Sequence, residues 1–352
     1  MYRLLLSLAL LLPTAHATEE QLPSYQPRVE GQRQLIAVVG DNRMTELVDY
    51  VVPYAVLKQA DVAEVHALSL DEGPLQMMPA LRLQAEQTIA AFDRQYPQGA
   101  DYLIVPAVHR SDDKRLGQWV AEQARKGATV VGVCDGVLVL GYAGLLDGKR
   151  ATGHWYSQRQ REDDFPTTHW QRDIRYISDG KLITTAGVTA ALPVSLALVQ
   201  AIAGPLKAGK LARQLGVSDW SPHHDSSAFG LTTDDYATAA GNMLAFWGHE
   251  TLRLDATQGM DDITLALRAD AWSRTFRSEV IAVANHTVVT RNGLHLLPDA
   301  VTSQAPALPP TDSTSSPIAQ LEQTLGIIAA RYDTGTARLV RQQLEYPDAL
   351  NH

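Results

Sequence analysis

The sequence predicts an α/β fold built around a parallel sheet. Short runs of apolar residues at 35–39, 101–106 and 128–133 are typical of buried strands. Segments with apolar residues at helical spacing, 45–60 and 116–126, lie between these runs. Strands that alternate with helices are joined by right-handed crossovers, so their sheet is parallel and covered on both faces. With 352 residues, 45% of them hydrophobic, the chain can form one large domain or two of ordinary size.

Further elements of the same kind lie between the first two runs. Residues 63–69 predict a strand, 71–81 a hairpin-like segment and 84–96 a helix. Ligands of parallel sheets bind at the carboxyl ends of the strands. The loop after Val39 and the turn after Val133 are both expected at that edge.

The single cysteine of the chain follows the strand at 128–133. Cys134 precedes Asp135 and Gly136, after which an apolar, helix-like run covers 137–146. A strand, a sharp turn and a helix form a nucleophile elbow, in which the turn lifts a reactive side chain clear of the sheet and the helix N-terminus stabilises an anion. We therefore expect Cys134 to be a nucleophile. The alternative is an inert, buried cysteine.

Three ordered motifs carry a resemblance to a known family. They are GVCDG at 132–136, AGLLDGKRATGHW at 143–155 and TTAGVTA at 184–190. In this order they resemble the ThiJ/PfpI superfamily, nearest to the branch of AraC-type regulator sensory domains and isocyanide hydratases, over roughly residues 35–216. The resemblance implies a flavodoxin-like sandwich of the class I glutamine-amidotransferase-like type. No basic helix-turn-helix pattern follows the core in this sequence, so we do not expect a transcriptional role.

The resemblance also implies an acidic partner for the cysteine. Asp49 lies four residues before Pro53, as does the family's acidic residue, whose carboxyl group approaches the cysteine sulfur in relatives. When protonated, such a group can donate a hydrogen bond to a thiolate or a proton to a substrate, and burial beside an anion raises its pKa. Glu46, one turn earlier, is the fallback acid, although a solvated carboxylate at a helix start is the simpler interpretation of it.

The other expected site residues surround the elbow. His154 matches a histidine typical of the branch and is expected either to act as a base or to make structural hydrogen bonds. The backbone N–H of Asp135, next to Gly136, is expected to serve an oxyanion hole.

Two departures from the family pattern argue against strong catalysis. Asp135 stands where many relatives have His or Thr, and a carboxylate there opposes thiolate formation. Ala107 and Val108 replace the usual glycine pair, so their side chains are expected to narrow the site or turn away an oxyanion donor.

The remainder of the chain resembles a degenerate second copy of the first unit. After the predicted ThiJ/PfpI-like domain at 33–216 and a connector at 217–250, residues 251–352 repeat the order of strand, helix, strand and hairpin. A stretch rich in Pro, Ser and Thr at 302–317, expected to be a flexible linker, replaces the elbow. We expect this degenerate second unit to be structural, as a lid or an internal mimic of a dimer partner. The alternative is a chance similarity of generic α/β elements.

The N-terminus and the charge favour an exported protein with no stable membrane insertion after signal cleavage. A short charged start, an apolar stretch and an Ala-x-Ala pattern predict a signal peptide at 1–17 and a periplasmic or secreted protein. An uncleaved anchor is the alternative, but about nine apolar residues are too few to span a bilayer. The net charge of −9 argues against nucleic acid and anionic membranes as partners. A homodimer is possible, as relatives commonly pair through the core.

These observations favour chemistry without a cofactor. The sequence has no GxGxxG motif after its first strand and no Walker loop, and the pair His223-His224 is interpreted as part of a polar loop rather than as a metal site. We expect a cysteine-dependent hydrolase, hydratase or lyase that acts on a small molecule without metal or cofactor. The alternative is a non-catalytic module of the same fold that binds a ligand or senses oxidants through its cysteine.

Overall fold

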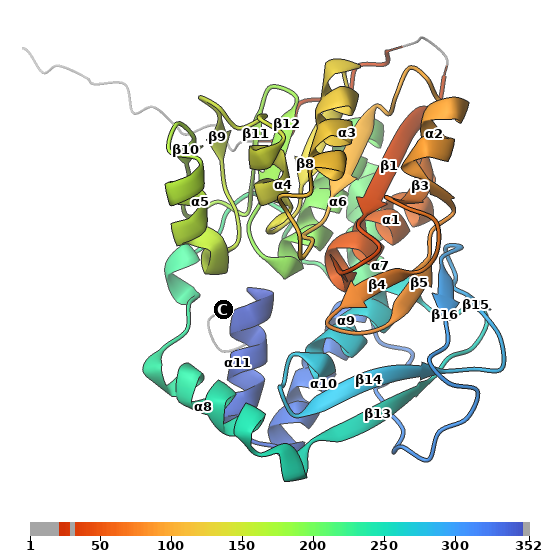
Figure 1. Ribbon diagram of the computed structural model, residues 1–352, viewed down its shortest axis with the longest axis vertical. Coiled ribbons are helices and arrows are strands. Elements are labelled where there is room, and N and C mark those ends of the chain that lie inside the picture. The colour runs from red at the N-terminus through yellow and green to blue at the C-terminus, as the bar shows by residue number, and fades with distance from the viewer. Residues whose placement is uncertain (1–20, 29–31, 348–352) are drawn as a thin grey trace, which may run out of the picture.

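The computed structural model describes residues 21–28 and 32–347 (Figure 1). The predicted signal peptide lies outside the described residues. Among the described helices, none combines the length and the apolar character that crossing a membrane requires.

A seven-stranded sheet forms the centre of the first unit and confirms the predicted α/β class. Its strand order is β11-β12-β8-β7-β1-β3-β6, and all neighbours are parallel except β11 and β12. The strands are β1 (Gln34–Gly40), β3 (Ala63–Ser69), β6 (Gln87–Thr88), β7 (Tyr102–Val105), β8 (Thr129–Gly132), β11 (Tyr176–Asp179) and β12 (Leu182–Thr185).

Helices cover both faces of this sheet, because its strands bury side chains on both sides. Along β1, Ile36 and Val38 join one core cluster, and Leu35, Ala37 and Val39 join the other. The first cluster is closed by α1 (Leu47–Ala60), α6 (Ala191–Ala203) and α7 (Pro205–Leu215). The second is closed by α2 (Ile89–Gln95), α3 (Lys114–Arg125) and α4 (Gly136–Tyr142). The helix α5 (Gln158–Asp164) and the short strands β9 (Arg150–Ala151) and β10 (His169–Trp170) lie beyond the elbow.

Two predicted helices are shorter in the structure than the sequence indicated. The helix expected at 84–96 begins only at Ile89, because Gln87 and Thr88 pair with β3 as a short strand and Thr88 caps the helix. The helical run expected at 137–146 ends at Tyr142, because Gly144 adopts a φ of +74°.

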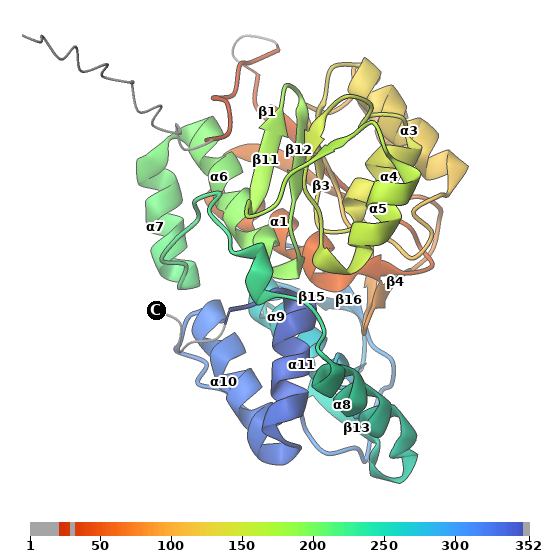
Figure 2. The same ribbon diagram turned by 90° about the vertical axis from the view of Figure 1, so that its left-hand side faces the viewer.

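The C-terminal unit has the predicted order of elements. The parallel strands β13 (Glu250–Asp255) and β14 (Ser278–Val283) are joined by α9 (Asp262–Ser273). They are followed by the hairpin strands β15 (Val288–Val289) and β16 (His295–Leu297) and by the helices α10 (Pro317–Arg331) and α11 (Thr334–Leu344). The helix α8 (Thr233–Leu244) links the two units and lies beside α11 (Figure 2).

The two units share a second, five-stranded sheet. Its order is β15-β16-β5-β4-β2, where β2 (Thr45–Glu46), β4 (Leu75–Met78) and β5 (Arg82–Gln84) come from the first unit. The helices α1 and α9 also pack against each other. The C-terminal unit therefore joins the first unit through both a helix pair and a continuous sheet.

The stretch at 302–317 departs from the flexible linker expected from its composition. Its backbone runs along β13, where the Arg253 N–H donates to Pro306 O at 2.9 Å and the Leu308 N–H donates to Arg253 O at 2.7 Å. Leu308 is buried in the core, and Thr311 donates a hydrogen bond to Gln320 of α10. An edge strand that needed backbone partners thus orders a segment of loop-like composition.

Candidate active site

The elbow at Cys134 has the strained backbone of a nucleophile turn. Cys134 adopts a φ of +54°, in the left-handed region that residues other than glycine seldom occupy. Its N–H donates to Thr185 Oγ1 at 3.0 Å, which ties the turn to β12. Gly136 begins α4 so close to β7 that a Cβ atom there would lie 2.0 Å from Val105 O. Among the described residues the Asp135 N–H has no acceptor, so this donor is available to a ligand.

Cys134 faces a mainly apolar cavity of about 590 Å³. Its wall includes Ala107, Asp135, His154 and Glu46 of the first unit. Most of the remaining wall is apolar or aromatic and comes from elements distant in sequence: Met78, Pro79, Val188, Leu231, Tyr236, Ala239, Ala240, Met243, Phe276 and Leu339. Only 4% of Cys134 is exposed to solvent. The cavity therefore suits a small apolar molecule better than a charged one.

Asp49 is fully buried beneath the elbow. Its Oδ2 accepts a hydrogen bond from the Ala107 N–H at 3.1 Å, and its Oδ1 has no hydrogen-bond partner. Burial, with a smaller effect of the Asp135 charge, raises the pKa of Asp49 well above its usual range. The structure thus gives Asp49 the character of a neutral acid, although within the described residues no hydrogen bond joins it to Cys134 Sγ.

Glu46 is not the solvated carboxylate that the simpler interpretation expected. It is buried and caps α1, where its Oε2 accepts from the Asp49 N–H at 2.6 Å. Its Oε1 accepts from the Arg274 guanidinium at 2.7 Å, and the Nε of Arg274 also donates to Asp270 at 2.7 Å. Burial together with the charge of Asp49 raises the pKa of Glu46. The arginine comes from the C-terminal unit, so α9 closes off from solvent a helix start that the first unit alone would leave open.

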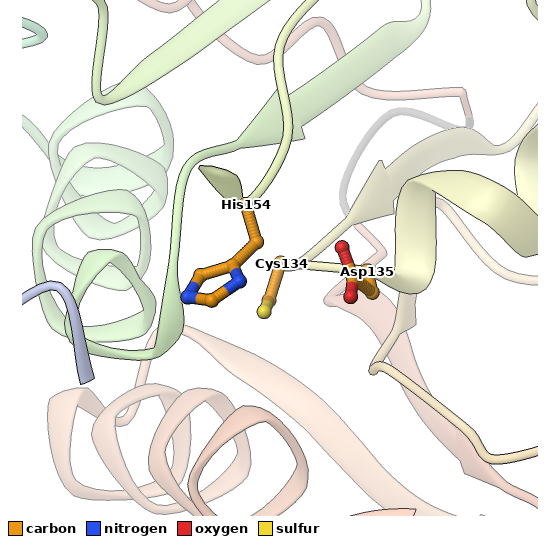
Figure 3. A group of neighbouring side chains, drawn as sticks. All are labelled: Cys134, Asp135 and His154. Carbon is orange, nitrogen blue, oxygen red and sulfur yellow. The ribbon is translucent and has the colours of Figure 1, made fainter. Parts of the chain in front are cut away.

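His154 lies beside the sulfur with both ring nitrogens engaged (Figure 3). Its Nδ1 accepts from the Tyr156 N–H at 3.3 Å, which leaves the proton on Nε2 to be donated to Gln343 O at 3.2 Å. Of the two roles expected for His154, these contacts favour the structural one, which fixes the ring against the cysteine.

Asp135 lies on the other side of the cysteine in Figure 3. Its carboxylate accepts from Ser157 Oγ at 2.6 Å, and Ser157 Oγ accepts in turn from Arg161 Nε at 3.0 Å. Potential ligand atoms of Cys134, Asp135 and His154 lie within 4.8 Å of one another. Because the histidine nitrogens and one Asp135 oxygen are already used by protein hydrogen bonds, we do not assign a metal site to them.

Of the replaced glycine pair, Ala107 behaves as expected and Val108 does not reach the site. Ala107 lines the cavity, but its N–H is bound to Asp49 and does not point to a ligand. Val108 is buried in the other core cluster and does not line the cavity. Segment 107–109 pairs instead with residues 44–46, where the Glu46 N–H donates to Ala107 O at 2.8 Å.

Two charged residues of the C-terminal unit reach the site and were missed by the sequence interpretation. One is Arg274; the other is Glu345, which follows α11 and accepts hydrogen bonds from the backbone N–H groups of Trp155 and Gly187. Burial alone would raise the pKa of Glu345. Its interactions, of which the contact with His224 has the largest effect, instead lower this pKa below its usual value. No motif in the sequence linked these residues to the cysteine, since their proximity depends on the packing of the two units.

Cys134 rests as a thiol in these surroundings. Burial raises its pKa well above the ordinary value, and the nearby acidic groups add to the effect wherever they are ionised: Asp49, Asp135, Glu46 and Glu345. The expectation that Asp135 opposes thiolate formation therefore agrees with the structure. The thiolate therefore forms only when a substrate or a nearby proton acceptor takes up the thiol proton.

Known proteins resemble this chain mainly in its first unit. The sequence profile described as the DJ-1/PfpI family matches residues 35–201. The chain is 32% identical over 185 residues to the isonitrile hydratase of Pseudomonas putida, with 51% of this chain and 77% of that protein covered. It is 30% identical over 177 residues to the HTH-type transcriptional regulator CdhR of Pseudomonas aeruginosa, with 49% of this chain and 51% of the regulator covered. The solved DJ-1beta of Drosophila melanogaster has a TM-score of 0.48 and 18% identity, with 53% of this chain and 100% of that chain covered.

The matched region contains the elbow but not the C-terminal unit. It covers the seven-stranded sheet from Leu35 onward and ends within α6. The chain thus spans about half the length of the regulator and 77% of the hydratase. The profile match and the identity over most of the hydratase place residues 35–201 in one family. The chain belongs to the DJ-1/PfpI family.

Proposed function

We propose that this protein is a cofactor-free hydratase that uses Cys134 to add water to a small, apolar electrophile, with an organic isonitrile as the leading substrate class. The observation that carries the proposal is the strained elbow, which presents a lone thiol to a mainly apolar cavity of about 590 Å³. The substrate class comes from the isonitrile hydratase of Pseudomonas putida, 77% of which is covered by its 185-residue alignment with this chain.

Isonitrile hydration balances without an oxidant or a metal. The thiol adds to the terminal carbon of R–N≡C: the S–H bond breaks, C–S and C–H bonds form, and the product is a thioformimidate, R–N=CH–S–Cys. Water then adds to the same carbon, the C–S bond breaks, the proton returns to sulfur, and the formamide R–NH–CHO leaves. In this scheme Asp49 delivers a proton to the carbon and takes one from the thiol, since its Oδ1 has no competing partner. The Asp135 N–H stabilises negative charge near the elbow.

The experiment measures formamide production from alkyl and aryl isonitriles before and after alkylation with iodoacetamide. Because Cys134 is the only cysteine of the chain, alkylation modifies one known thiol. Alkylated protein is expected to produce no formamide, and intact-mass analysis of untreated protein during turnover is expected to show a substrate adduct. Formamide production that survives complete alkylation would contradict the proposal.

Asp49→Asn provides the second arm of this experiment. Asparagine keeps the size of the side chain and can still accept from the Ala107 N–H, but it carries no exchangeable carboxyl proton. Turnover is expected to fall by about 10²-fold or more. The melting temperature is expected to stay the same or rise, which separates the chemical effect from a folding defect.

A non-catalytic ligand-binding module is the second candidate. The raised pKa of the Cys134 thiol and the engaged nitrogens of His154 favour it, because both limit nucleophilic attack. Peroxide sensing fits less well, since oxidation of cysteine proceeds through the thiolate. The substitutions of Cys134 described in the Discussion separate the two candidates.

We also propose that the protein is exported to the periplasm or the medium and contacts neither nucleic acid nor membrane after signal cleavage. The N-terminal pattern at 1–17 and the net charge of −9 support this proposal. N-terminal sequencing of the mature protein tests it: a chain that begins at Thr18 is expected, and an intact Met1 would contradict cleavage.

A further inference from the structure

The shared sheet joins the two units in the strand order of a two-fold interface. In the antiparallel pair of β5 and β16, the middle residues Leu83 and Leu296 face each other. The flanking pairs are Gln84 with His295 and Arg82 with Leu297. The hairpins β15-β16 and β4-β5 therefore meet through the second strand of each, and the order β15-β16-β5-β4 is the one that an isologous contact between equivalent hairpins gives.

The helices α1 and α9 have equivalent positions in the two units. The helix α1 follows β1 and packs on α6, and α9 follows β13 and packs on α10. Each begins with an acidic cap: Glu46 accepts from the N–H of Asp49, and Asp261 accepts from the N–H of Thr264, three residues on in both cases. The helices α1 and α9 also pack against each other. The C-terminal unit therefore sits on the first unit as a second copy of it would.

The packing of α9 on α1 places the charged side chain of Arg274 at the site. It follows the last residue of α9, lines the cavity, and binds Glu46 and Asp270 through hydrogen bonds of 2.7 Å each. Both carboxylates are buried, so without the guanidinium Glu46 beside Cys134 and Asp270 of α9 would lose the cation that compensates them.

We propose that the C-terminal unit takes the place of a second subunit, so that the protein acts as a monomer with one site, and that Arg274 is the positioning residue this unit contributes, compensating Glu46 beside Cys134. The inference goes beyond the proposed hydration, because it requires only that Cys134 be a titrating thiol and holds for any substrate.

The charges that face Cys134 come from several elements. The acidic groups are Glu46 and Asp49 of β2 and α1, Asp135 of the elbow and Glu345 after α11; the cations are Arg274 after α9 and Arg161 of α5; the imidazole ring of His154 completes the set. Of these, only Arg274 and Glu345 belong to the C-terminal unit. The hydrogen-bonded pair with Arg274 favours the ionised form of Glu46 against the effect of burial. Removing the positive charge of Arg274 must therefore disfavour the thiolate, and removing the carboxylate of Glu46 must favour it.

A double-mutant cycle that removes the charges of Arg274 and Glu46, with the reactivity of the Cys134 thiol as its readout, tests the positioning role. The second-order rate of Cys134 alkylation by iodoacetamide is measured from pH 6 to 11 in the wild type, Arg274→Met, Arg274→Lys, Glu46→Gln and the double variant Glu46→Gln with Arg274→Met. A shift of one pKa unit changes the thiolate fraction about tenfold. Arg274→Met is expected to lower the rate at pH 8 by roughly tenfold, and Glu46→Gln to raise it by a similar factor. The double variant and Arg274→Lys are expected to return to within about threefold of the wild type.

A matched surface variant and the molar mass complete the test. Arg291→Met removes an exposed arginine of the same unit, paired with Asp261, and is expected to leave the rate unchanged. If Arg274→Met does not fold, Glu46→Gln still reports the sign of the charge effect on the thiol, and a rate that does not rise in Glu46→Gln would overturn the positioning role. An unchanged rate in Arg274→Met, or a double variant as slow as Arg274→Met, would overturn the positioning role.

Light scattering at micromolar concentration is expected to give the mass of one chain, and a stable homodimer would overturn the replacement of a subunit. None of these readouts depends on hydration, so a failure here is distinguishable from a failure of the proposed activity.

Discussion

Gly136→Ala is expected to destabilise the folded protein by about 3 kcal/mol or more, or to prevent folding. The added Cβ would lie 2.0 Å from Val105 O and 2.9 Å from the carbonyl carbon of the same residue. Val105 belongs to β7, which is hydrogen-bonded between β1 and β8 in the middle of the sheet. The strand cannot retreat without breaking pairs on both sides, so α4 and the elbow would have to move instead.

Urea unfolding of Gly136→Ala and of a matched glycine variant measures this effect. Gly326 lies within α10, and a Cβ there would meet no atom within 4 Å. Gly326→Ala is expected to stabilise the protein by about 0.5–1 kcal/mol, because alanine loses less backbone entropy in a helix than glycine does. A Gly136→Ala protein as stable as the wild type would mean that the elbow is not held against β7 as described.

The elbow and its sheet were predictable because their signals are local. Buried strands appear as apolar runs, and the break after Val133 places Cys134 at the carboxyl edge whatever the rest of the chain does. The same holds for Asp49, since its place in the motif and its helix fix it beneath the elbow. The order of elements in the C-terminal unit was likewise readable from its own apolar pattern.

The electrostatics of the site could not be predicted from those signals. Glu46 has the sequence context of a solvated helix start, and only the packing of α9 on α1 buries it against Arg274. The stretch at 302–317 has the composition of a linker, and only the free edge of β13 orders it. In each case the deciding partner is more than 45 residues away in sequence or belongs to the other unit, so that no local pattern records it.

Cys134→Ala is expected to abolish isonitrile hydration, with a loss of about 10³-fold or more. Cys134→Ser is expected to be nearly as inactive, because a serine hydroxyl is a far weaker nucleophile unless a base activates it and both nitrogens of His154 are engaged. All three side chains carry a Cβ atom, so the strain of the φ of +54° is common to them and does not confound the comparison. Formamide production is measured by chromatography and stability by thermal unfolding.

The alanine variant also decides between catalysis and binding. The apolar wall of the cavity is unchanged in Cys134→Ala, so an isonitrile or its formamide is expected to raise the melting temperature of wild type and variant alike. Turnover in the wild type with binding but no turnover in the variant would establish Cys134 as the nucleophile. Binding in both proteins with turnover in neither would establish the non-catalytic module. Equal turnover in both proteins would contradict a role of the thiol in the reaction, and the chemistry would then rest on Asp49 and the Asp135 N–H acting on a water molecule in the cavity.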